Sequence, residues 1–144
     1  MILDKKEIKN LIPHRKPFLF LDSVKIIESG KKGIGFRKFL STEYFFEGHF
    51  PNMPIVPGVV LIEALAQTAG VVVSKKFEEF KNKSVLFVSI TNPKFRNPVY
   101  PEDEISFNVE FINELKNFYK FTGTAYKGDT KVCESEFSAV ITKS

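Results

Sequence analysis

One of the two histidines in the sequence has surroundings suited to accepting a proton. His49 lies in residues 44–51 (YFFEGHFP), where Gly48 and Pro51 direct the backbone and the phenylalanines make the environment apolar. Apolar surroundings favour the neutral imidazole, which can take up a proton near pH 7. The alternative interpretation is a core histidine whose ring nitrogens bond to backbone groups.

Glu63 is the second candidate, because an acid is rarely buried without a partner. It lies within an apolar run over residues 55–73 (IVPGVVLIEALAQTAGVVV). Burial raises the pKa of a carboxyl group, which can then hold a proton at neutral pH and donate it. Gln67, one helical turn later, is placed to orient it. The alternative is an acid that reaches solvent through a gap. A dry histidine and a buried glutamate together supply the two halves of acid–base catalysis.

Gly58 follows Pro57 at the start of the same run. A glycine N–H at the start of a helix is approachable, and the helix dipole there favours negative charge. This N–H is therefore a candidate donor to a substrate oxygen on which negative charge develops. A glycine needed only for close packing fits the position equally well.

Other kinds of site are not indicated. His14 and His49 are far apart in sequence and have no acids at ligand spacing, so we expect no metal site. Cys133 is predicted to be a small buried residue in a strand. The net charge of +4 is spread over cationic runs of two residues at most, which does not resemble a nucleic-acid-binding stripe.

The elements that position these residues begin with one long helix. Residues 55–73 are apolar on every helical face except at three positions, so the helix must be buried in protein. Pro57 suits its first turn, and the helix is predicted to continue through residues 75–79. The internal acid and amide, and flanks without a tryptophan/tyrosine belt, argue against a membrane span. With no secretory signal and a single cysteine, we expect a cytoplasmic protein.

Strands are predicted over most of the remaining chain. Residues 103–112 alternate strictly between apolar and polar side chains. Further strands are predicted over residues 23–28, 33–40, 84–90, 118–126 and 132–142. A short helix is predicted over residues 4–10, with Asp4 as its cap and Glu7 completing a capping box.

One buried helix and five or six antiparallel strands predict a single α+β domain over residues 1–144. The sheet must curve around the helix to cover it. A single sheet cannot cover a helix completely, so the uncovered flank and the sheet edges predict self-association.

Three stretches resemble the FabZ family, the (3R)-hydroxyacyl-[acyl-carrier-protein] dehydratases of type II fatty-acid synthesis. They are residues 11–22 (LIPHRKPFLFLD), 46–60 (FEGHFPNMPIVPGVV) and 62–70 (IEALAQTAG). The resemblance implies the hotdog fold, an antiparallel sheet wrapped around one long central helix. It also implies a homodimer, often assembled as a trimer of dimers. The implied substrate is carried on the phosphopantetheine of acyl carrier protein, and no cofactor is expected.

The resemblance further implies two active sites at each dimer interface. Each takes His49 from one chain and Glu63 from the other, with the Gly58 N–H on the thioester carbonyl. His49 removes the C2 proton and Glu63 protonates the departing 3-hydroxyl group. The residues expected to contact the acyl substrate are Tyr100, Gln67 and Phe50.

Lys94 and Arg96 are the candidates for docking acyl carrier protein. Lys16 stands where the family usually has tyrosine, and Ser23 where it often has arginine. Details of the N-terminal segment, and of the mouth of the tunnel that holds the acyl chain in the family, therefore do not carry over. His14 is interpreted as structural.

Two alternatives stay open: a hotdog acyl thioesterase, whose acid activates water, and a non-catalytic acyl-binding module.

Overall fold

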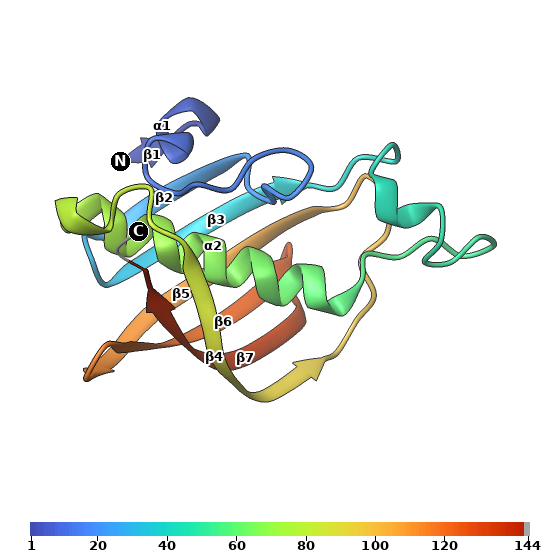
Figure 1. Cartoon of the computed structure of the whole chain (residues 1–144). Coiled ribbons are helices and arrows are strands. Elements are labelled where there is room, and N and C mark those ends of the chain that lie inside the picture. The colour runs from blue at the N-terminus through green and yellow to red at the C-terminus, as the bar shows by residue number, and fades with distance from the viewer. Residues whose placement is uncertain (143–144) are drawn as a thin grey trace.

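The computed structural model describes residues 1–142 and confirms the predicted antiparallel sheet around one long helix (Figure 1). The helical elements are α1 (Lys5–Lys9), η1 (Tyr44–Phe46), α2 (Gly58–Lys76) and η2 (Glu78–Phe80). The strands are β1 (Ile2–Leu3), β2 (Ser23–Glu28), β3 (Lys32–Lys38), β4 (Val85–Phe95), β5 (Glu104–Leu115), β6 (Phe118–Lys127) and β7 (Thr130–Ile141). They form one sheet in the order β1-β2-β3-β5-β6-β7-β4, and every pair is antiparallel.

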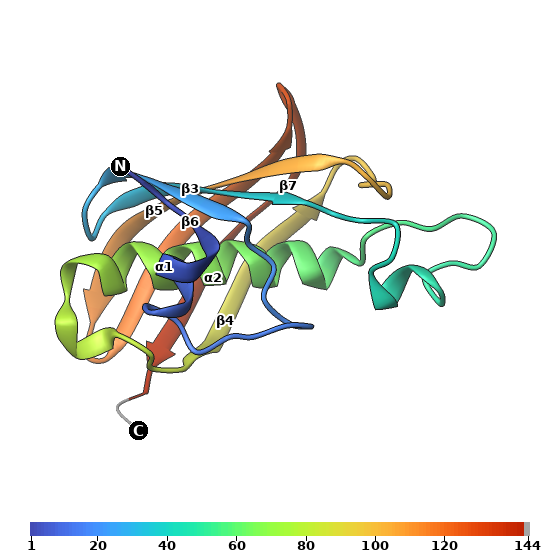
Figure 2. The same ribbon diagram turned by 90° about the horizontal axis from the view of Figure 1, so that it is seen from above.

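The helix α2 lies along the inner side of the curved sheet, as both views show (Figures 1 and 2). From residue 60 to residue 74 every residue is buried except Glu63. The helix is long and apolar enough to cross a membrane, but 78% of its most apolar 18-residue window is buried inside the protein. It is therefore the core helix that the sequence pattern predicts.

The predicted bounds of this helix are corrected at both ends. Pro57 is the N-cap of the helix instead of lying in its first turn. The preceding residue, Val56, donates its N–H to the Val99 carbonyl oxygen. Proline disfavours helical backbone in the residue that precedes it, so Val56 lies outside the helix. Pro57 itself has an extended ψ of 137°, so the first helical residue is Gly58. At the other end Phe77 is extended and a 3-10 turn follows, because the buried Phe80 turns the chain back towards the core.

Strand β4 is longer than predicted and forms one edge of the sheet. It runs past the predicted end at residue 90, through Asn92, which has a positive φ of 50°, and Pro93. The pairing with β7 shifts register between Thr91 and Lys94, so these residues form a β-bulge within the strand. The apolar residues Leu86, Phe87, Val88, Ile90 and Phe95 are exposed along it.

The N-terminal helix is confirmed and a small strand is added before it. Asp4 accepts a hydrogen bond from the backbone of Glu7, and the Glu7 side chain accepts one from the backbone of Asp4. These are the two bonds of a capping box. The strand β1 was not predicted, because two residues are too few for an alternating pattern; it pairs with β2.

Candidate functional site

The His49 imidazole is oriented by a backbone carbonyl. Its Nδ1 lies 3.1 Å from the carbonyl oxygen of Ile55. Because a carbonyl oxygen only accepts hydrogen bonds, Nδ1 carries the ring hydrogen and Nε2 keeps a free lone pair. The ring of Phe50 stacks on the imidazole with centroids 4.2 Å apart. The residue is thus arranged as a proton acceptor at Nε2.

His49 and Gly58 line the same open cleft, which has a volume of about 400 Å³. Gly58 begins α2, and no side chain caps this end of the helix. The N-terminal N–H groups of a helix lack intrahelical partners and carry partial positive charge. A Cβ at Gly58 would lie 2.5 Å from the Phe95 ring, so glycine lets this ring pack closely against the start of the helix. Close packing and an approachable N–H therefore coexist at this position.

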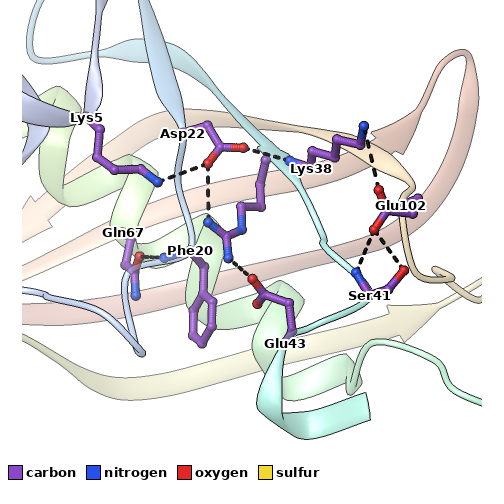
Figure 3. A network of polar contacts seen from close by, with 9 residues as sticks. Lys5, Phe20, Asp22, Lys38, Ser41, Glu43, Gln67 and Glu102 are labelled. Carbon is purple, nitrogen blue, oxygen red and sulfur yellow. Dashed lines mark hydrogen bonds and ion pairs between the residues drawn. The ribbon is translucent and has the colours of Figure 1, made fainter.

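A polar network ties the segment that leads to His49 to the sheet (Figure 3). The Arg37 guanidinium on β3 donates from Nη1 to Asp22 Oδ1 at 3.2 Å and from Nη2 to Glu43 Oε1. Glu43 directly precedes η1. The Ser41 N–H and hydroxyl both donate to Glu102 Oε2, at 2.6 and 2.8 Å. These contacts fix the start of the segment, which extends beyond the N-terminal end of α2 in Figure 2.

Glu63 is held from within the core by Gln67. Gln67 is fully buried; its Nε2 donates to Glu63 Oε2 at 3.0 Å and to the Phe18 carbonyl at 2.9 Å, and its Oε1 accepts from the Phe20 N–H at 2.8 Å. Both amide hydrogens are used by protein acceptors. Gln67 therefore lies behind Glu63 and orients it, and its expected contact with the acyl substrate stays a prediction.

The Glu63 side chain is 19% exposed. Burial raises the pKa of its carboxyl group, and the hydrogen bond from Gln67 opposes this in part. His14 Nε2 lies 3.5 Å from Glu63 Oε2, in the segment between α1 and β2. Sequence reasoning interpreted His14 as structural. Its 49-residue separation from Glu63 leaves no local pattern that would have indicated the contact.

Within residues 1–142, no hydrogen bond or ion pair joins His49 to Glu63, and Glu63 does not line the His49 cleft. A single chain thus presents two separate half-sites. Tyr100 lies in the β4–β5 connection, outside the lining of the cleft, and its N–H bonds to Asp103. Arg96 lines the cleft, and its guanidinium donates to both carboxylate oxygens of Glu134, at 3.1 and 3.3 Å.

The chemistry available at these half-sites is acid–base chemistry. One presents an imidazole lone pair beside a helix N-terminus, and the other a carboxyl group with a raised pKa. The part of the chain that the structure describes has no group of three or more His, Cys, Asp or Glu side chains placed to hold a metal ion. Burial raises the pKa of the Cys133 thiol to about 12, so it is a poor nucleophile.

Comparisons with known proteins point to one family. Residues 12–136 match the FabA-like domain family. The chain is 48% identical to a 3-hydroxyacyl-[acyl-carrier-protein] dehydratase FabZ of Clostridium kluyveri, over 94% of both chains. It is 40% identical to a FabZ of Campylobacter fetus subsp. fetus, over 97% of this chain and 98% of the relative.

Among solved structures, a dehydratase heterocomplex from Xenorhabdus doucetiae has a TM-score of 0.75 at 14% identity, covering 94% of this chain and 90% of that one. A hypothetical thioesterase with coenzyme A from Streptococcus pneumoniae has a TM-score of 0.60 at 12% identity, covering 83% and 86%. At these identities the likeness concerns the fold, and the predicted hotdog fold is confirmed.

We expect Arg37→Met to lower the free energy of unfolding by about 3 kcal/mol, because it leaves the nearly buried Glu43 carboxylate without its cation. Adding Glu43→Gln should recover part of this loss. As a control, Lys32→Met removes an exposed pair with Glu110 and should cost less than about 1 kcal/mol. Urea denaturation at fixed protein concentration measures all four proteins. Equal effects of Arg37→Met and Lys32→Met would contradict the anchoring role.

We expect Glu63→Gln to stabilise the protein increasingly as pH rises. The folded pKa of Glu63 lies above the ordinary glutamate value, so in wild type the folded state binds more protons and loses stability as pH rises from the ordinary pKa to the folded pKa. Glutamine does not titrate. The difference in unfolding free energy, variant minus wild type, should therefore grow from about pH 4.5 and then level off.

Glu134→Gln is the matched control for this titration, with the opposite sign. Arg96 and Lys131 lower the pKa of Glu134 to about 2. Its contribution to stability is therefore present above the unfolded pKa and is lost as pH falls towards 2. Denaturation curves between pH 2 and pH 8 should show the differences of the two variants from wild type changing with opposite signs as pH rises. A pH-independent difference for Glu63→Gln would mean that this carboxyl group titrates normally.

Proposed function

Because the chain belongs to the FabZ family, we propose that it dehydrates a 3-hydroxyacyl group carried on acyl carrier protein, giving the trans-2-enoyl thioester and water. The observation that carries this proposal is the Glu63 carboxyl group. It is the one non-buried residue in the core stretch of α2, its pKa is raised by burial, and Gln67 orients it. Such a carboxyl group can hold a proton at neutral pH until a hydroxyl group leaves.

In the proposed mechanism His49 Nε2 removes the proton from C2 of the substrate. The electron pair of that C–H bond develops enolate-like charge on the thioester, and the Gly58 N–H donates to its oxygen. The C3–O bond then breaks, Glu63 of the partner subunit gives its proton to the leaving oxygen, and water departs. Each acid–base group is expected to contribute roughly 10²–10⁴-fold. Phe50 and Tyr100 are the proposed contacts to the acyl chain.

The separation of His49 and Glu63 supports a site shared between two chains. Strand β4 is the long edge strand of the sheet, opposite the two-residue β1, and carries exposed apolar side chains along its length. An edge of this kind is a template for pairing with a second copy. Val59, 74% exposed in the first turn of α2 beside the His49 cleft, adds to the apolar surface there. We propose a homodimer joined along β4, in which the sheet continues from one chain to the next.

The proposed partner in the reaction is acyl carrier protein, with Lys94 and Arg96 as docking residues. Arg96 shares its charge with Glu134, so Lys94 is the stronger candidate for an acidic partner. Assembly of the dimers into a trimer of dimers, and a cytoplasmic location, stay predictions.

A hotdog thioesterase is the competing function, and one assay separates the two. Incubation with a 3-hydroxybutyryl thioester should produce the ultraviolet absorbance of an enoyl thioester and no free thiol. We expect His49→Ala and Glu63→Gln each to fold and associate, and to lose roughly 10²–10⁴-fold in this rate. Thiol release without enoyl formation in wild type would establish the thioesterase, and near-normal dehydration by either variant would remove the role given to that residue.

Mixing the two inactive variants tests whether the site is shared. In a mixed dimer one site contains both substituted residues and the other contains neither. Random exchange at equal amounts should therefore recover about one quarter of the wild-type rate. If each chain carried a complete site, mixing would recover nothing.

We expect Ile90→Lys to prevent dimer formation, because it places a charge on the exposed apolar edge of β4. Light scattering after size exclusion should then report a monomer. The dehydration rate should also fall, because His49 of one chain no longer meets Glu63 of the partner subunit. Leu115→Lys is the matched control, since this exposed apolar residue ends β5, away from the β4 edge. A monomer that retains activity would contradict the shared site.

A further inference from the structure

His14 faces the proposed acid from a different part of the chain. Its side chain is 14% exposed, and its Nε2 lies 3.5 Å from Glu63 Oε2. This is longer than an ordinary N–H···O hydrogen bond of about 2.7–3.2 Å, as catalytic hydrogen bonds without substrate often are. The segment that carries His14 is tied to α2 a few residues later, where Phe18 and Phe20 both bond to Gln67.

The surroundings of His14 determine which ring nitrogen carries the hydrogen. Nδ1 is buried and has no hydrogen-bond partner within residues 1–142. A buried N–H without an acceptor is costly, so the hydrogen belongs on Nε2, where the Glu63 carboxyl group can accept it. Burial and the neighbouring Arg15 guanidinium both lower the pKa of His14, so the ring is neutral.

The hydrogen bonds around Glu63 distinguish its two oxygens. The Phe20 N–H requires an acceptor, so the atom of the Gln67 amide that faces it is the oxygen Oε1. The amide nitrogen Nε2 therefore points towards Glu63 Oε2. His14 Nε2 faces the same oxygen. Because Gln67 donates to Oε2 and His14 Nε2 faces the same oxygen, an acidic proton on this carboxyl group belongs on Oε1.

Two elements supply the charged and polar neighbours of His14 and Glu63: the N-terminal segment and α2. On the N-terminal segment the charged neighbour is Arg15, whose guanidinium donates to the carbonyl oxygens of Lys9, Ile12 and His14. On α2 the polar neighbour is Gln67, which does not titrate. In the proposed dimer, His49 of the partner subunit is the further titratable group.

We propose that His14 is a positioning residue for Glu63: its Nε2–H, with the Gln67 amide, holds Oε2 so that Oε1 carries the proton that is transferred. This inference rests on the proposed function. When Glu63 gives its proton to the leaving hydroxyl group, the C3–O bond breaks and water departs. The carboxylate left behind is stabilised by both donors, until it regains the proton that His49 took from C2, through solvent.

Two substitutions at residue 14 separate this role from a packing role. His14→Gln can place an amide N–H near the position of Nε2, whereas His14→Asn places its amide near Nδ1 and cannot reach Glu63. Without the donor the Glu63 carboxylate is less stable. We therefore expect His14→Asn to lower kcat roughly tenfold with little change in KM. The alkaline limb of its kcat–pH profile should move to higher pH. His14→Gln should stay close to wild type in both.

Two outcomes would overturn the inference while leaving dehydration intact: a wild-type pH profile in His14→Asn, or equal losses in both variants. His14→Ser gives the same comparison if the asparagine variant does not fold. The carboxyl titration of Glu63, followed by ¹³C NMR, is independent of turnover. It should show a higher pKa in His14→Asn than in wild type and His14→Gln, and an unchanged pKa would overturn the inference. Absence of enoyl product from wild type would instead overturn the proposed function.

Discussion

The site depends on a single buried amide. Gln67 uses both amide hydrogens and its carbonyl oxygen, and in doing so it joins Glu63 to the backbone at Phe18 and Phe20. A carboxyl group in an apolar core stays where it is only if its hydrogen bonds are satisfied. The same amide holds the N-terminal segment against α2. One side chain therefore both fixes the segment that covers the helix and orients the Glu63 carboxyl group.

The fold places a second constraint on the same helix. One sheet and one short N-terminal segment cover α2 almost completely, and the residue of its core stretch that is not buried is the acid. The sheet that covers the helix ends in an open edge at β4, where apolar side chains face solvent in a single chain. The exposed apolar edge and the separation of His49 from Glu63 both support the proposed pairing with a second copy.

The two half-sites are anchored independently. The segment that carries His49 is tied to β3 through Arg37 and Glu43, and the Ile55 carbonyl then orients the imidazole. Glu63 is anchored from the helix and the N-terminal segment instead. Because the anchors share no residue, each half-site keeps its geometry in the single chain, and the proposed dimer would bring two preformed surfaces together.

The sequence by itself determined the core helix, most of the strands and the pair of candidate acid–base residues. These follow from local periodicity and from the rarity of an acid in an apolar run, neither of which needs tertiary information. Only the tertiary structure decided that the helix begins after Pro57, that Asn92 forms a bulge inside a strand, and that His14 meets Glu63. A bulge and a turn use the same residue types, and a contact between residues 49 positions apart is created by packing alone.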